Sequence, residues 1–355
     1  MFFVLLLTPL MVQHFKIRNY KIGYEKKNKR MLLFFFVFLT ILVMLRHESI
    51  GTDTRNYIYY FNKISNMDWI TIGKQYREVG FSYFIKVVSL FSKEKQFFFA
   101  VVAIGVFCML YPTYKRLCVD SSLTIVLFCI MPTFVMMFSG IRQMIAIGIG
   151  FIAYELVRQK RVFPFIVVVC LAMTFHTSAF MLIFMYPIYH AKITKKWLWF
   201  VIPLLITTFI LNKQIFSILG LILERYTDYS ATIVKTGAYT MLILFGIFMV
   251  ISYVIPEESR LDEETIGLRN FLLVSVAIQL FAPLHTIAMR MNYYYIIFIP
   301  LLLPRIIGYR SRRWCQGAIV IRNMMVLFFL VYFFMNAYRG SNLKVFPYHF
   351  FWENI

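Results

Sequence analysis

Several ionisable side chains stand in or beside apolar stretches of this chain, where they could act on an anionic ligand. Arg142 precedes one hydrophobic run, and His176 interrupts another. Ionisable residues at membrane depth are costly and usually face a pathway or a site. An arginine can bind phosphate oxygens bidentately, while a neutral histidine or a carboxylate can accept a proton from a hydroxyl. These residue types suit transfer from a lipid-linked phosphate or diphosphate donor.

Each candidate also has a purely structural interpretation. Arg142 and Arg290 flank apolar runs, where a long side chain often anchors a helix at the membrane interface. His176 could be a hydrogen-bonded helix cap, and Asp53 could cap a helix that begins near Tyr57. The stronger signal is that the expected membrane topology brings all four residues to the same face.

Other reaction chemistries lack their motifs. The chain has no glycine-rich phosphate loop, no HExxH and no nucleophile elbow. Its five cysteines are scattered and show no metal-ligand spacing. We therefore expect neither a cofactor nor a metal. The net charge of +21 comes mainly from short basic clusters between apolar runs, a pattern that follows the positive-inside rule and argues against nucleic-acid binding.

The composition predicts the elements that must position these residues. Hydrophobic residues make up 61% of the 355 and charged residues 15%, more apolar surface than a soluble domain could bury. We predict an all-α, polytopic membrane bundle of about 12 transmembrane helices. The expected spans are approximately 1–15, 31–45, 97–114, 121–138, 141–157, 162–175, 177–190, 197–212, 237–255, 267–284, 291–304 and 314–335.

The basic clusters give the orientation. Lys16 to Arg30 contains seven lysines or arginines and should be cytoplasmic, which places the N-terminus outside. The later clusters at 115–116, 158–161, 192–196 and 305–313 then fall on the same side. This parity requires two short helices within 162–190, turning near His176. If that segment were one span, everything after it would invert.

The remaining polar residues lie on the outer side. A long outer loop covers about 46–96, and 79–91 is too short for a span, so we predict an interfacial or re-entrant helix there. The segment 215–223 has the same character. We expect the whole of 1–355 to form a single membrane domain.

Four groups of residues resemble a known family. They are Gly51-x-Asp53-x-x-x-Tyr57-x-x-x-Phe61, Glu78-x-Gly80-Phe81, Ser139-Gly140-x-Arg142-Gln143-x-x-Ala146 and Phe175-His176-x-Ser178-Ala179. In this order they resemble the EpsG family of bacterial exopolysaccharide and capsule proteins, related to the Wzy-type O-antigen polymerases. The resemblance covers residues 45–190 well. The remainder, including Arg290 with the tyrosines that follow it, is similar only in general character.

The resemblance implies a membrane glycosyltransferase at the outer face of the bacterial cytoplasmic (inner) membrane. Such a polymerase joins oligosaccharide repeat units carried on undecaprenyl diphosphate into exopolysaccharide, capsule or O-antigen. Its partners would be the lipid bilayer, a flippase and a chain-length regulator. A flippase or exporter of the lipid-linked oligosaccharide is the main alternative. A ligase or an acyltransferase on a similar architecture also stays open.

The same resemblance suggests a role for each candidate. Arginines would neutralise the departing diphosphate, and a histidine or carboxylate would orient or deprotonate the acceptor hydroxyl. The expected catalytic residues are Arg142, His176, Asp53, Glu78 and Arg290, and the expected substrate-binding residues are Gln143, Arg225 and Tyr293.

Overall fold

The computed structural model describes residues 21–223, 236–308, 315–338 and 344–354. Within these ranges every regular element is a helix, and the single isolated bridge joins Arg46 to Phe350. The all-α prediction is therefore confirmed. The chain forms two compact units, Met1–Ile183 with Gln316–Ile355 and Phe184–Cys315. The expected single domain for the whole chain stays a prediction.

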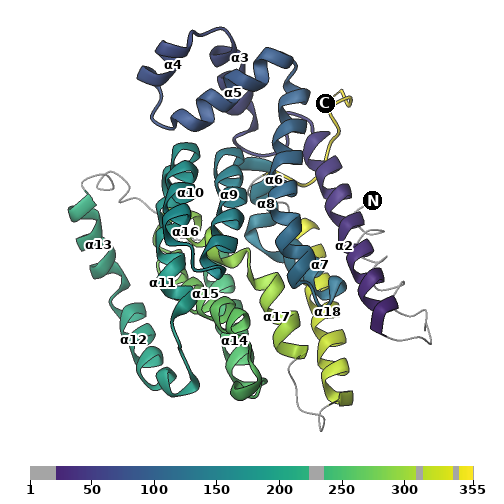
Figure 1. Ribbon diagram of the computed structural model, residues 1–355, viewed down its shortest axis with the longest axis vertical. Helices are drawn as coiled ribbons and strands as arrows, with labels where there is room; N and C mark the ends of the chain where they lie inside the picture. The colour runs from purple at the N-terminus through teal and green to yellow at the C-terminus, as the bar shows by residue number, and fades with distance from the viewer. Residues whose placement is uncertain (1–20, 224–235, 309–314, 339–343, 355) are drawn as a thin grey trace. The chain divides into compact units, whose positions relative to one another are not determined.

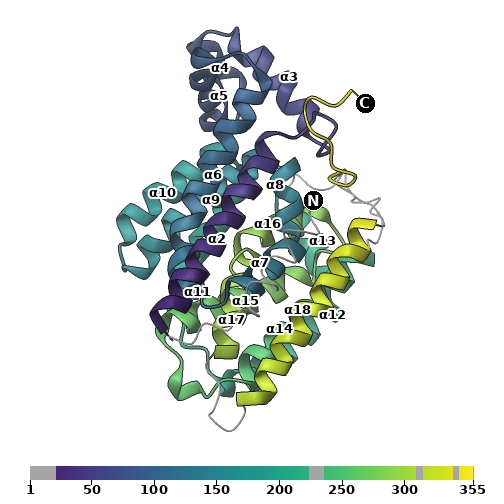
Figure 2. The same ribbon diagram turned by 90° about the vertical axis from the view of Figure 1, so that its right-hand side faces the viewer.

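The first unit contains ten of the described α-helices and a 3₁₀ helix, η1, whose last residue falls in the second unit. They are α2 (Lys21–Met44), α3 (Thr54–Ser65), α4 (Trp69–Gln75), α5 (Val79–Phe91), α6 (Lys95–Leu117), α7 (Ser121–Ile130), α8 (Pro132–Ser139), α9 (Ile141–Arg158), α10 (Val162–Phe175), η1 (Thr177–Phe184) and α18 (Cys315–Tyr338). Figure 2 shows α2, α6 and α9 side by side, and α10 packs against α9.

Three helices of the segment predicted as the outer loop, α3, α4 and α5, gather at one end of α9 and α10 (Figure 1). The α3 helix is amphipathic and buries Tyr57, Phe61 and Ile64, which recur at helical spacing. The Phe61 ring stacks on Phe98 of α6, with 4.9 Å between ring centroids. The helix predicted at 79–91 is confirmed as α5, whereas its location in the membrane interface stays a prediction.

Close backbone contacts at two glycines position α3 and α5. A Cβ on Gly80 would lie 2.1 Å from the Thr174 hydroxyl of α10. A Cβ on Gly51 would lie 2.2 Å from the Phe138 carbonyl oxygen, and Gly51 has φ +86°, a conformation that favours glycine. Glycines in two of the family-like motifs therefore let α3 and α5 approach the ends of α8 and α10.

Gly51→Ala is expected to lower the free energy of unfolding by about 2–4 kcal/mol, because alanine there adds both a steric clash and left-handed backbone strain. The thermal unfolding midpoint of the purified protein measures this effect. Gly105→Ala in α6 is the matched control, since a Cβ there meets nothing within 4 Å. Equal midpoints for the two variants would contradict the proposed contact.

The chain reverses direction at His176, as the sequence predicts. The α10 helix ends at Phe175, and η1 begins at Thr177. Leu182 of η1 packs against Gly150, near the middle of α9. The η1 helix therefore runs back along α9, the helix against which α10 also packs. This turn places His176 at the same end of the unit as the start of α9.

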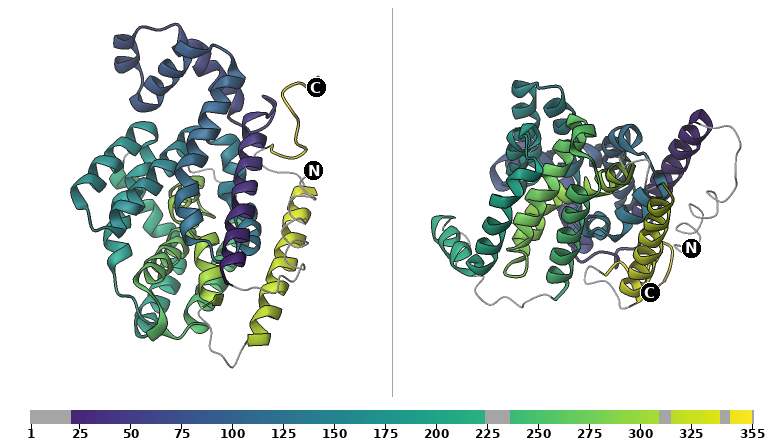
Figure 3. Two further views of the ribbon diagram at one scale, coloured as in Figure 1. Left: turned by 45° about the vertical axis from the view of Figure 1, so that its right-hand side comes forward. Right: turned by 90° about the horizontal axis from the view of Figure 1, so that it is seen from below.

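The residues after α18 pack beside the end of α2 (Figure 3). The backbone N–H of Gly51 donates to the Lys344 carbonyl over 3.1 Å, and that of His47 donates to the His349 carbonyl over 2.9 Å. The Tyr348 hydroxyl donates to the Leu42 carbonyl over 2.6 Å. This C-terminal tail (residues 344–354) therefore holds the segment that leads into α3.

The second unit is built around α15. Its described helices are α11 (Met185–His190), η2 (Lys195–Trp197), α12 (Leu198–Ile210), α13 (Asn212–Leu223), α14 (Thr236–Val254), η4 (Glu258–Arg260), α15 (Glu263–Gln279), α16 (Thr286–Ile296) and α17 (Ile299–Gly308). The α15 helix packs against α11, α14, α16 and α17. Its fully buried Arg269 donates to the Glu258 carboxylate over 2.9 Å and lies 4.1 Å from the centre of the Tyr253 ring.

Helix length and composition give fewer clear spans than the sequence predicts. Among the described helices only α6 is long and apolar enough to cross a membrane alone, and the number rises to four if each of three bent helix pairs is one span. Two of these pairs are α7 with α8, bent by 63°, and α16 with α17, bent by 47°. The number of about 12 spans therefore stays a prediction. The expected first span, 1–15, lies outside the described residues.

Candidate functional site

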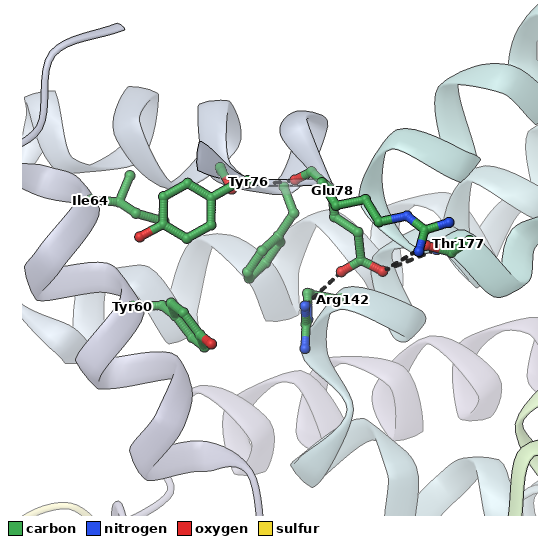
Figure 4. A pocket seen from close by; sticks show the side chains of 9 residues that line it. Tyr60, Ile64, Tyr76, Glu78, Arg142 and Thr177 are labelled. Atoms are coloured by element: carbon green, nitrogen blue, oxygen red, sulfur yellow. Dashed lines mark hydrogen bonds and ion pairs between the residues drawn. The ribbon is translucent and has the colours of Figure 1, made fainter. Parts of the chain in front are cut away.

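Glu78 joins three separate parts of the chain in the first unit. Its Oε2 accepts a hydrogen bond of 2.6 Å from Nη1 of Arg142. Its Oε1 lies 2.8 Å from Nδ1 of His176 and accepts a 3.0 Å bond from the backbone N–H of Thr177. Figure 4 shows Glu78 between Arg142 and Thr177. Arg142 and His176 follow Glu78 by 64 and 98 positions in the sequence. The three candidates thus form one cluster, Glu78–Arg142–His176.

Helix ends position all three side chains. Glu78 directly precedes α5, and Arg142 is the second residue of α9. His176 is the C-cap residue of α10, and its backbone N–H donates to the Ala172 carbonyl. The helix-cap interpretation is therefore correct for its backbone, while its imidazole bonds to Glu78. The cluster forms because the start of α5, the start of α9 and the end of α10 meet.

The contacts of Glu78 decide its charge. Its side chain is 13% exposed, and burial alone would raise the pKa of its carboxyl. The hydrogen bond from His176 and the positive charge of Arg142 outweigh burial and lower that pKa to about 2. The carboxylate is thus ionised at neutral pH and can only accept hydrogen bonds. Nδ1 of His176 must therefore donate, which leaves Nε2 of a neutral imidazole as an acceptor.

Aromatic rings and Glu78 hold the Arg142 guanidinium. Its central carbon lies 5.7 Å from the centre of the Tyr57 ring and 5.9 Å from that of Phe81, within the range of cation–π attraction. Its Nε is buried and has no hydrogen-bond partner among the described residues. The side chain is 39% exposed, so this charged group is fixed in place and still reachable by a ligand.

A cavity of about 270 Å³ opens beside the cluster. Its lining residues are Tyr60, Ile64, Tyr76, Arg77, Glu78, Phe81, Ser82, Arg142 and Thr177. In Figure 4, Tyr60, Ile64 and Tyr76 lie on one side, and Glu78, Arg142 and Thr177 lie toward the other. The cavity therefore has an aromatic wall and a charged wall.

Sequence reasoning missed several of these lining residues, among them the polar or charged Tyr60, Tyr76 and Arg77. Tyr60 is three positions after Tyr57, so the two lie near one face of α3, and this spacing was a usable signal. Tyr76 and Arg77 lie in the short connection between α4 and α5. Nothing in the sequence marked that connection as part of a site.

Two other candidates of the first unit do not line the cavity. Asp53 directly precedes α3, but its carboxylate makes no capping hydrogen bond to that helix. Its backbone N–H donates to the Ser139 hydroxyl over 3.4 Å, which ties the Gly51-x-Asp53 motif to the residues before Arg142. Gln143 of α9 is 2% exposed, so its side chain is buried among the helices. Their proposed roles in catalysis and substrate binding stay predictions.

The remaining candidates belong to the second unit or lie outside the described residues. Arg290 is exposed on α16, and Tyr293 on the same helix is buried. Just before α16, burial lowers the pKa of His285, and the charge of Arg290 lowers it further. Arg225 falls within 224–235, outside the described residues. The joint site of Arg142, His176 and Arg290 stays a prediction.

A model of the EpsG family matches residues 29–350, nearly the whole chain. The matched segment contains the Glu78–Arg142–His176 cluster and every residue that lines the cavity. No curated protein and no solved structure shows a significant match to the chain.

Proposed function

Because this chain belongs to the EpsG family, a family of Wzy-like polysaccharide polymerases, we propose that it polymerises oligosaccharide repeat units carried on undecaprenyl diphosphate. The reaction takes place at the outer face of the bacterial cytoplasmic membrane. The Glu78–Arg142–His176 cluster is the observation that carries this proposal. In this cluster the Arg142 guanidinium lines a cavity, and the His176 imidazole, a potential proton acceptor, hydrogen-bonds to Glu78 of the same lining. These contacts support the proposal.

The transfer forms one glycosidic bond and breaks one sugar–phosphate bond. A hydroxyl of the acceptor unit attacks the anomeric carbon of the donor sugar, and lipid diphosphate leaves with the bonding electrons. Nε2 of His176 takes the proton of the attacking hydroxyl. This assignment uses the imidazole nitrogen that Glu78 leaves unoccupied.

Arg142 stabilises the negative charge that develops on the leaving diphosphate. Its guanidinium is held by Glu78 and lies against the rings of Tyr57 and Phe81, so it needs little reorganisation during the reaction. Glu78 serves as a positioning residue. A carboxyl with a pKa of about 2 is a weak base at neutral pH, which disfavours Glu78 as the proton acceptor.

Reconstitution tests this function. The full chain in proteoliposomes, supplied with undecaprenyl diphosphate repeat units from its host, should produce a ladder of longer chains on gels. Arg142→Ala is expected to reduce chain growth by about 100–1000-fold, the usual loss when one preorganised donor is removed from a transition state. Arg142→Lys should recover part of the activity, because it restores the charge without the planar fork.

Arg158→Ala is the matched control for this assay. Arg158 ends the same helix, α9, and pairs with Glu155 at the end away from the cavity. This variant should extend chains like the wild type. Movement of lipid-linked units across the bilayer without chain growth would instead identify a flippase.

A further inference from the structure

The two walls of the cavity differ in chemistry, and this difference restricts the ligand. Tyr60 and Tyr76 are both half-buried, and their rings meet edge to face with 6.2 Å between centroids. A tyrosine presents an apolar ring face and a polar hydroxyl. A sugar likewise presents C–H faces and hydroxyls, so these rings form a surface suited to a sugar ring.

Arg77 adds a second cation to the lining. It is exposed and makes no ion pair among the described residues, whereas the charge of Arg142 is matched by Glu78. Two guanidinium groups and one carboxylate leave the lining with one excess positive charge. A phosphate group suits that excess, and arginine is the side chain that binds phosphate oxygens bidentately.

The size of the cavity limits how much of a substrate it can hold. Pockets for drug-sized ligands have volumes of about 300–1000 Å³, and this cavity, at about 270 Å³, lies just below that range. It can take one sugar ring with an attached phosphate. A repeat unit of several sugars would extend beyond it.

We propose that this cavity binds the sugar–diphosphate junction of the lipid-linked substrate. Tyr60 and Tyr76 contact the sugar ring, and Arg77 binds the phosphate oxygens. The inference rests on the proposed function and deepens it, because it names the part of the substrate that the cavity recognises and three residues that recognise it. Arg77 thereby binds the diphosphate that Arg142 stabilises during transfer.

The test measures binding of two short-chain lipids to the full chain in nanodiscs by thermophoresis. One probe is farnesyl diphosphate, and the other is farnesyl diphosphate that carries one glucose. Arg77→Ala should weaken binding of both probes by about 10-fold or more. The double variant Tyr60→Ala with Tyr76→Ala should weaken only the glucose-bearing probe, by about 10-fold.

Two residues that do not line the cavity supply matched controls. Tyr239 is an exposed tyrosine of α14, and Lys74 is an exposed cation of α4. Tyr239→Ala and Lys74→Ala should bind both probes like the wild type. Thermal unfolding of each variant in nanodiscs verifies that it is folded.

The inference is overturned if the wild type binds neither probe, or if the Arg77 and tyrosine variants bind both probes as the wild type does. These outcomes are separate from a failure of the proposed function. A wild type that shows the expected binding pattern but extends no chains would remove the polymerase activity and keep the ligand class.

Discussion

Glu78→Gln is expected to reduce chain growth by about 100-fold or more, although glutamine has nearly the same shape. The substitution removes the negative charge that pairs with Arg142 and fixes Nδ1 of His176 as a donor. Losing the group that sets the tautomer of a catalytic histidine costs about 10⁴-fold in the serine proteases. The rate of polymer formation by reconstituted protein measures the effect. Glu94→Gln, at an exposed carboxylate before α6, is the control.

The same variant also has an expected signature in acid. The folded pKa of Glu78, about 2, lies below its usual value of 4.5, so ionised Glu78 stabilises the folded protein by about 3 kcal/mol above pH 5. That contribution is lost as the pH falls from about 4.5 toward 2. The gap in unfolding midpoint between wild type and Glu78→Gln should therefore narrow over this range. A gap independent of pH, together with unchanged chain growth, would contradict the role of Glu78.

His176→Ala is expected to lower kcat for chain growth by about 100–10,000-fold, the range for loss of a general base. KM should change little, because proton abstraction by the imidazole stabilises the transition state rather than the bound substrate. Single-turnover rates on lipid-linked units measure the loss of rate in the chemical step directly. His190→Ala, at the end of α11, should leave both constants unchanged.

A wild-type kcat in a correctly folded His176→Ala protein would exclude the imidazole as the proton acceptor. Asp53 would then be the remaining sequence candidate of the first unit, since the low pKa of Glu78 disfavours it as a base. Asp53→Asn, measured in the same assay, separates the two assignments.

Many helices could be predicted from the sequence because apolar runs with basic or polar ends specify them. The predicted 162–175 coincides with α10, and 79–91 coincides with α5. The run 121–138 was expected as one helix but breaks at Met131, because Pro132 begins α8 and favours an extended residue before it. The bend between α16 and α17 comes just before Pro300, the second residue of α17. Proline has no N–H to donate to the Ile296 carbonyl, so this break also had a marker within the run 291–304 that was expected as one helix.

The site could be predicted as a set of residues but not as a geometry. The sequence identified Glu78, Arg142 and His176 as separate candidates, and Arg142 and His176 each also had a structural interpretation. It could not pair them, because the pairing depends on where helix ends meet in space. Arg77 and Tyr76 were missed because a short connection between helices has no periodicity to interpret.

The C-terminal tail has a consequence for biogenesis. The segment that leads into α3 hydrogen-bonds to Lys344 and His349, about three hundred positions later in the chain. Translation proceeds from the N-terminus, and early segments usually fold first. Residues 45–51 can acquire these partners only after residues 344–351 have been synthesised. The α3 helix, which carries Tyr60, and the α5 helix, which Glu78 directly precedes, should therefore reach their final arrangement only after residues 344–351 have left the ribosome.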